Sequence, residues 1–238
     1  KGDLCSNSYH YGQTGDGGFA QYALVEEKQV YKVPKYISPD ILAQAEPLAC
    51  VMSAIKVAKP TPMDYVLLYG AGPIGLTFIK VLKLMGVNNL IVTDRSKNRV
   101  EEARLLKTGV IVDTSINSLE NEMKKHWPDK ADLVFDAVGH GSVMSEATDM
   151  LNSRGRLILF GLNTHSLSKV KPSDFVLREL SVHGILGKEF PAAIELLKNK
   201  NLGLNQIISH RLLLDEIHEG FELLKKQEAN RIIIYPNK

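Results

Sequence analysis

The stretch Tyr65-Val66-Leu67-Leu68-Tyr69-Gly70-Ala71-Gly72-Pro73-Ile74-Gly75 decides the fold of this 238-residue chain. Its first five residues are apolar or aromatic and predict a buried parallel strand, which the glycines follow directly. Glycines at this spacing let the chain turn tightly and bring backbone N–H groups to a pyrophosphate at the N-terminus of the next helix. The sequence therefore predicts a dinucleotide site at Gly70, Gly72, Pro73, Ile74 and Gly75.

An acidic residue answers the glycine loop after the next apolar run. Asp94 lies 94 − 70 = 24 positions beyond Gly70. A carboxylate at the end of the second strand accepts hydrogen bonds from ribose hydroxyls and repels a 2′-phosphate, which favours NAD over NADP. Arg95 and Arg99 follow closely, and each guanidinium could host a phosphate, stack on the adenine or stay in solvent.

The rest of the central region alternates short apolar runs with stretches of helical periodicity. This alternation predicts an α/β fold, a doubly wound Rossmann parallel sheet covered on both faces. Residues 74–85 show the spacing of an amphipathic helix. The strands are expected at residues 65–69, 90–93, 110–112, 133–135, 156–160 and 181–186.

The two ends of the chain have a different pattern. The turn signal at 15–18 precedes alternating apolar residues up to Val33, which predicts antiparallel hairpin strands. At the other end we expect a strand over 206–214, a helix over 216–226 and a final strand over 231–235. Two β-rich ends around an α/β middle suggest that the termini meet in a second domain.

Composition and charge limit the possible partners. The 29 basic and 27 acidic residues are spread along the chain and give a formal charge of +2, so no basic stripe indicates nucleic acid or an anionic membrane. No apolar stretch is long enough to span a bilayer. Cys5 and Cys50 cannot form a disulfide framework, and the cytoplasm is the expected location. A small-molecule partner is favoured.

Several of these segments resemble one known family. The strings Gly15-Asp16-Gly17-Gly18-Phe19-Ala20-Gln21-Tyr22 and Ala45-Glu46-Pro47-Leu48, with the glycine triplet and Asp94, resemble the zinc-type medium-chain alcohol dehydrogenases, particularly the polyol and threonine dehydrogenase branch. The resemblance implies the remaining part of a GroES-like catalytic domain at 1–37, a Rossmann domain at 38–203 and a return to the catalytic domain at 204–238. It also implies an N-terminal truncation, so we expect this chain to bind NAD but to oxidise alcohols poorly or not at all.

The resemblance assigns further residues. It implies that Glu46 is a catalytic-zinc ligand or a close partner of one, although a solvated glutamate at a helix N-terminus is the alternative. Cys5 falls where the last of four structural-zinc cysteines should lie, and alone it is an orphaned ligand or a free thiol. Other residues are implied to approach the ribose, nicotinamide or pyrophosphate, with ordinary turn positions or a solvated arginine as the alternatives: Val138, Gly139, Gly161, Leu162 and Arg231.

The implied function is NAD-dependent oxidation of a secondary alcohol or polyol by hydride transfer, with zinc in the intact enzyme. One alternative is a zinc-free, NADPH-dependent medium-chain reductase of the quinone type. Another is a nucleotide-binding module without catalysis, and a methyltransferase fits the glycine pattern less well. The apolar strand expected at 181–186 could pair with that of a second copy, so a homo-oligomer, either a dimer or a tetramer, is expected. The histidines, including His126, His183 and His210, show no ligand spacing and are expected to be structural.

Overall fold

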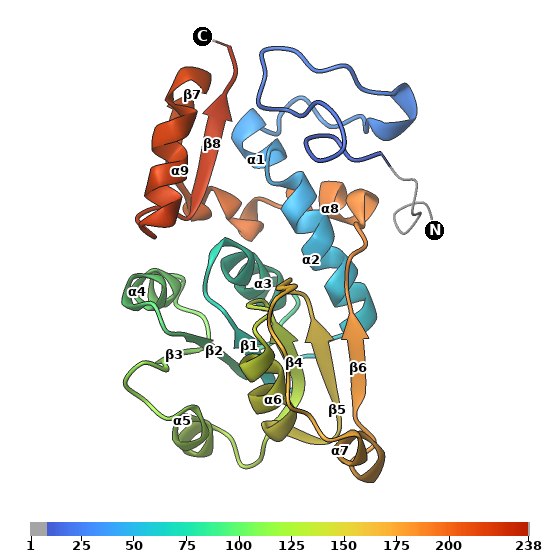
Figure 1. The fold of residues 1–238 in the computed structure, drawn as a ribbon, viewed down its shortest axis with the longest axis vertical. Helices are drawn as coiled ribbons and strands as arrows, with labels where there is room; N and C mark the ends of the chain where they lie inside the picture. The colour runs from blue at the N-terminus through green and yellow to red at the C-terminus, as the bar shows by residue number, and fades with distance from the viewer. Residues whose placement is uncertain (1–8, 238) are drawn as a thin grey trace. The chain divides into compact units, whose positions relative to one another are not determined.

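The computed structural model describes residues 9–237. The chain forms two compact units, and each is described by itself. We call residues 46–193 the sheet unit, and we call residues 1–45 together with 194–238 the terminal unit. Each element below is found by its label in Figure 1.

The sheet unit contains six parallel strands in the order β3-β2-β1-β4-β5-β6 (Figure 1). This order confirms the doubly wound sheet predicted from the sequence, with its order reversing between β1 and β4. β1 and β2 pair from Val66↔Leu90 to Tyr69↔Thr93, and β1 and β4 from Val66↔Leu133 to Tyr69↔Asp136. The strands are β1 (Val66–Tyr69), β2 (Leu90–Asp94), β3 (Val110–Asp113), β4 (Ala131–Asp136), β5 (Leu151–Leu159) and β6 (Ser181–Gly184).

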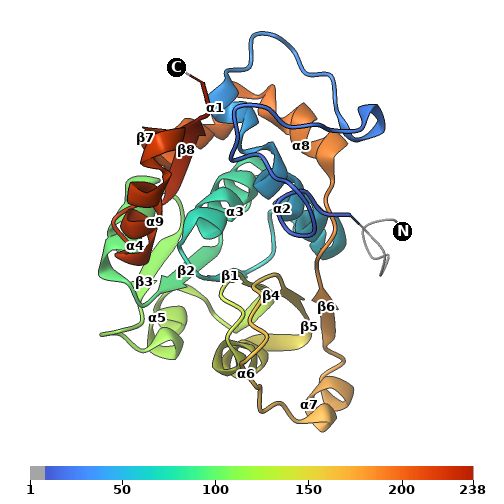
Figure 2. The same ribbon diagram turned by 45° about the horizontal axis from the view of Figure 1, so that its top comes forward.

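Helices cover both faces of this sheet (Figure 2). Phe78 of α3 packs on Phe135 of β4 with ring centroids 4.7 Å apart. Met123 of α5 belongs instead to the buried cluster that contains Val134. Since neighbouring strand residues point to opposite faces, α3 and α5 cover opposite sides. The helices are α2 (Ala45–Ala58), α3 (Pro73–Leu84), α4 (Lys97–Leu105), α5 (Leu119–His126), α6 (Gly141–Asp149), α7 (Pro172–Leu177) and α8 (Phe190–Leu197), which crosses into the terminal unit.

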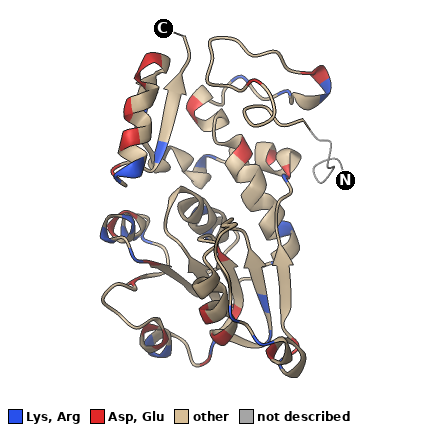
Figure 3. Cartoon of the chain, viewed as in Figure 1, with Lys and Arg blue, Asp and Glu red and all other residues tan. Residues whose placement is uncertain are grey.

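Charged residues lie mainly on the helices around the sheet. In Figure 3 the strands β1 and β4 are largely tan, whereas α4 and α5 carry interspersed basic and acidic residues. The four residues of β1 are buried, as the predicted core strand requires. Within residues 9–237, no helix combines the length and the apolar character needed to cross a bilayer.

The terminal unit contains a small parallel pair of strands, β7 (Ile208–Leu213) and β8 (Arg231–Tyr235), joined through α9 (Ile217–Lys225). This confirms the strand, helix and strand expected near the C-terminus. Asp40 ties these strands to the short helix α1 (Pro39–Leu42), because its carboxylate accepts hydrogen bonds from Arg211 Nε, at 2.7 Å, and from the Tyr235 hydroxyl. The same two hydrogen bonds lower the pKa of Asp40. The short 3-10 helices are η2 (Glu27–Gln29), η3 (Lys200–Leu202), η4 (Leu204–Ile207) and η5 (Leu214–Glu216).

The hairpin strands predicted before Val33 are wrong for the described residues. Residues 9–33 contain only an isolated bridge between Tyr11 and Gly15 and the 3-10 helix η2. The alternating side chains have no face to cover, since Tyr22 is 89% exposed and Leu24 is 95% exposed. Alternation predicts a strand only where a neighbouring strand and a buried face are present.

A charged network closes the sheet unit at the start of β1. Arg156 of β5 donates from Nη2 to Asp64 Oδ1 at 2.6 Å and from Nη1 to the Ala58 carbonyl at 2.8 Å. Both partners of this ion pair are largely shielded from solvent, whereas the nearby pair between Arg154 and Glu179 is exposed. The two arginines therefore differ in what their removal should cost.

We expect Arg156→Met to lower the free energy of unfolding by about 2 kcal/mol, because it leaves a partly buried carboxylate and a carbonyl without their donor. Arg154→Met is the matched control and should cost less than about 1 kcal/mol, since it removes an exposed ion pair. Urea titrations of both variants measure the difference. Equal losses for the two substitutions would contradict the role given to Arg156.

Candidate nucleotide site

The glycine loop has the backbone geometry that its sequence predicts. Gly70 directly follows β1 with φ +97°, a left-handed conformation that favours glycine, and its N–H donates to the Thr93 carbonyl at 2.8 Å. A Cβ at Gly75 would lie 1.9 Å from the Gly70 carbonyl oxygen, so no side chain fits there. Gly72 is the N-cap of α3, and Pro73 occupies its first turn. The N–H groups in the first turn of α3 point toward the N-terminus of the helix and have no partner within it.

Asp94 lies at the end of β2 and holds this loop. Its Oδ2 accepts from Ala71 N at 2.8 Å and its Oδ1 accepts from Ser96 N at 2.8 Å, while only 9% of the side chain is exposed. Each carboxylate oxygen has a second lone pair, so the acid can also accept from a hydroxyl. Asp94 thus has a structural bond to the loop that sequence reasoning did not anticipate.

Two arginines follow Asp94, and they differ in their contacts and exposure. Arg99 lies with Nη1 3.9 Å from Asp94 Oδ2, and its guanidinium carbon is 3.6 Å from where a Cβ on Gly72 would be. Arg95 is exposed. Arg99 therefore borders the glycine loop and the acid together.

The loop after β4 is organised by a carboxylate that the sequence did not single out. Asp136 is 2% exposed, and its Oδ1 accepts from Val138 N and Gly139 N, both at 2.9 Å. Burial raises the pKa of Asp136, and the two backbone hydrogen bonds oppose that rise. The available signal in the sequence was an aspartate at the end of a predicted strand, because such a side chain can accept from the backbone N–H groups two and three residues on.

The loops after β4 and β5 pass each other at van der Waals distance. A Cβ at Gly139, whose φ is +79°, would lie 2.5 Å from the Gly161 carbonyl carbon, and a Cβ at Gly161 would lie 2.2 Å from Gly139 N. Val138 is also close to the glycine loop, with Cγ2 3.1 Å from where a Cβ on Gly70 would be. Leu162 is 83% exposed. The structure thus brings the segments of Gly70, Val138, Gly139 and Gly161 together at the carboxyl ends of the central strands.

Glu46 has partners other than a metal. It lies in the first turn of α2, and its Oε1 is 2.7 Å from Lys188 Nζ and 3.7 Å from the Cys50 thiol, which donates to it. Burial raises the pKa of Cys50 to about 11, so this cysteine is a protonated thiol at neutral pH. Cys5 lies outside the described residues.

The described residues do not by themselves fit a zinc site. Within 9–237, no three histidine, cysteine, aspartate or glutamate side chains come close enough to hold a metal ion. A zinc ion needs about three protein ligands, and Glu46 supplies one carboxylate at most. Arg231, which begins β8, belongs to the terminal unit and is half-buried.

Comparison with known proteins adds to this geometry. The chain is 27% identical over 227 residues to (R,R)-butanediol dehydrogenase of Bacillus subtilis, covering 94% of this chain and 65% of that protein. A structure described as a short chain alcohol dehydrogenase from Escherichia coli CFT073, complexed with NADH, superposes with a TM-score of 0.91 at 27% identity, covering 98% of this chain and 70% of that one.

A structure from Sinorhizobium meliloti bound to NADP, described as that of a "putative zinc-binding dehydrogenase", superposes with a TM-score of 0.84 at 27% identity, covering 91% of this chain and 65% of that one. This chain spans about two thirds of the length of these three proteins. The family model for zinc-binding dehydrogenases matches residues 73–199, from the first turn of α3 to the end of α8 and beyond, which is more than half of the sequence. The chain therefore belongs to the zinc-binding dehydrogenase family.

Proposed function

We propose that this chain supplies the NAD-binding part of a dehydrogenase that oxidises a secondary alcohol or polyol. The observation that carries the proposal is the pairing of the glycine loop with a shielded carboxylate, since Asp94 Oδ2 is 2.8 Å from Ala71 N. Relatives named as alcohol dehydrogenases support the general reaction, an oxidoreductase acting on a small molecule. The alcohol itself and the choice of NAD are the further steps that we propose.

The choice of NAD rests on charge. A 2′-phosphate at the adenosine ribose would lie against the Asp94 carboxylate, whereas two ribose hydroxyls would donate to it. Arg99 opposes this preference, because a guanidinium 3.9 Å from the acid could donate hydrogen bonds to a 2′-phosphate. Solved relatives carry NADH in one case and NADP in another, so the family alone supports either cofactor.

We assign the remaining loops to the other parts of the cofactor. The N-terminus of α3 would bind the pyrophosphate through the backbone N–H groups of Ile74 and Gly75, while Pro73, which has no N–H, fixes the first turn. The segments around Gly139 and Gly161 would border the nicotinamide ribose, with Val138 and Leu162 as its apolar neighbours. Arg231 at the start of β8 is proposed as a pyrophosphate contact because of the family resemblance, and Arg95, which is exposed, as a solvent-facing neighbour of the ribose.

Only membership of the zinc-binding dehydrogenase family supports the proposal that the protein binds zinc. Glu46 is proposed as one ligand, with Lys188 as the cation that neutralises it when no metal is present. Cys5 is proposed as a structural-zinc ligand. The domain limits at 37/38 and 203/204 and the cytoplasmic location also stay predictions.

A second copy of the chain is proposed as the partner of β6. This strand lies at the end of the sheet order, and Ser181, His183 and Gly184 are exposed. Exposed apolar side chains at Val176, Leu177 and Leu186 lie in the segments next to it. An unprotected edge with apolar neighbours is suited to antiparallel pairing about a twofold axis.

The cofactor proposal predicts that the chain binds NADH at least about tenfold more tightly than NADPH. Asp94→Ala should weaken NADH binding by about tenfold or more, because it removes the ribose acceptor and frees Ala71 N. Asp94→Asn keeps an acceptor for that N–H but loses the charge, so it should mainly narrow the preference between the two cofactors. Titrations followed by nicotinamide fluorescence measure all three proteins.

Glu101→Ala is the control for these titrations, since Glu101 is an exposed acid of α4 paired only loosely with Lys97 at 4.0 Å. It should leave both affinities within about twofold. A wild-type preference for NADPH would replace the proposal with the NADPH-dependent reductase. Binding of neither cofactor would contradict the assignment of the glycine loop.

The edge-strand proposal predicts a particle of twice the chain mass of 26.4 kDa in light scattering. The double substitution His183→Lys and Leu186→Lys should convert it to a monomer, because both side chains are exposed and lysines at a strand edge disfavour pairing. Leu105→Lys is the matched control, as Leu105 is an exposed apolar residue at the end of α4. Loss of the dimer in the control as well, or a wild-type monomer, would count against β6 as the interface.

A further inference from the structure

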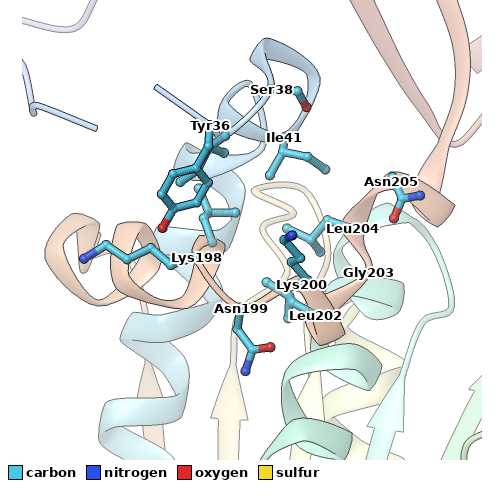
Figure 4. Close-up of a pocket in the computed structure, with 12 residues that line it drawn as sticks. Tyr36, Ser38, Ile41, Lys198, Asn199, Lys200, Leu202, Gly203, Leu204 and Asn205 are labelled. Atoms are coloured by element: carbon cyan, nitrogen blue, oxygen red, sulfur yellow. The ribbon is translucent and has the colours of Figure 1, made fainter. Parts of the chain in front are cut away.

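The terminal unit contains a cavity of about 250 Å³. Residues 36–41 form one side of it, and residues 197–205 form the other (Figure 4). Its walls include five aliphatic side chains, four of them buried: Ile37, Ile41, Leu197, Leu202 and Leu204. All twelve residues that line the cavity belong to the terminal unit, and the glycine loop belongs to the sheet unit.

Fixed turns shape this cavity. Gly203 separates η3 from η4 in a left-handed conformation with φ +63°, which favours glycine. The buried Gln44 side chain donates from Nε2 to the Leu204 carbonyl at 3.2 Å and so fixes the position of this turn. Asn199 Oδ1 accepts from Asn201 N at 2.9 Å and closes the start of η3. The backbone next to Leu202 and Leu204 is therefore fixed by hydrogen bonds on one side of the cavity.

The charged side chains at the cavity are all basic. The lining residues include Lys198 and Lys200 and no aspartate or glutamate. Lys198 Nζ is 2.5 Å from Glu195 Oε2, so this carboxylate neutralises the lysine. In Figure 4 the Lys198 ammonium points away from the other residues that line the cavity. The Lys200 side chain instead rises toward Ile41 in the middle of the view. Among the salt bridges of the described residues, none involves Lys200.

We propose that this cavity binds an aliphatic monocarboxylate, with its chain on the leucine and isoleucine walls and its carboxylate at Lys200. Apolar burial favours the chain, and one ammonium without an acidic neighbour favours one negative charge. A dry cavity of about 150 Å³ lined by such residues takes a benzene-sized guest, so this larger one suits a chain of about six to eight carbons.

Octanoate is the probe for this site, and octanamide is its neutral counterpart of the same shape. Methyl-labelled protein titrated with octanoate should show chemical-shift changes at Ile41, Leu202 and Leu204. Octanamide should bind at least about tenfold more weakly, because the ammonium at Lys200 then pairs with no charge. Acetate, which has the charge without the chain, should produce no saturable change at these methyl groups.

Two lysine variants separate a binding role from general surface charge. Lys200→Met should weaken octanoate at least about tenfold and leave octanamide unchanged, whereas Lys198→Met should change octanoate by less than about twofold, because Glu195 already neutralises that ammonium. Ile41→Trp should abolish binding of both ligands by filling the cavity. A thermal unfolding midpoint close to that of the wild type shows that each variant is folded.

Three results would overturn the proposal. They are equal affinities for octanoate and octanamide, equal effects of the two lysine variants, and octanoate-induced shifts confined to methyl groups of the sheet unit. The test does not depend on the proposed dehydrogenase activity, because it requires neither NADH nor an alcohol.

Discussion

The carboxylate of Asp94 is the contact on which the nucleotide site depends. It accepts from Ala71 in the glycine loop and from Ser96 before α4, so one charged group joins the segments that follow β1 and β2. Hydrogen bonds to an ionised acceptor are stronger than neutral ones, and only 9% of this side chain is exposed. The residue that Asp94 holds, Ala71, lies between Gly70 with its positive φ and Gly72, the N-cap of α3. The proposed recognition of a ribose and the hydrogen bond to the loop thus involve the same side chain.

The parallel sheet could be predicted because its strands are short, buried and separated by helices with clear periodicity. The predicted residues 90–93 and 110–112 differ from β2 and β3 by a single residue at one end. β5 begins at Leu151, five residues earlier than predicted. The prediction missed these residues because Asn152, Ser153 and Arg154 are polar. Those residues lie in a region where the register with β4 shifts, and hydrophobic pattern carries no information about such a shift.

The candidate site was predictable where a local motif carries the geometry, as at Gly70 and Gly75. It was not predictable where distant residues meet. Lys188 lies 142 positions from Glu46, and nothing in either neighbourhood indicates that they form an ion pair. The interlocked Gly139 and Gly161 are a similar case, since each glycine reads locally as an ordinary strand-end turn. Alternation before Val33 predicted strands because the pattern does not reveal whether a pairing partner is available.

The division of the chain into units has a consequence for synthesis on the ribosome. The terminal unit combines the first 45 residues with residues 194–238, whereas the sheet unit is continuous from 46 to 193. Domains generally fold as units while the chain emerges, beginning with whichever is complete first. The sheet unit can therefore acquire its core while the ribosome still holds β7 and β8. During that interval Asp40, which later binds Arg211 and Tyr235, lacks these two partners, and it can bind them only after β7 and β8 have emerged.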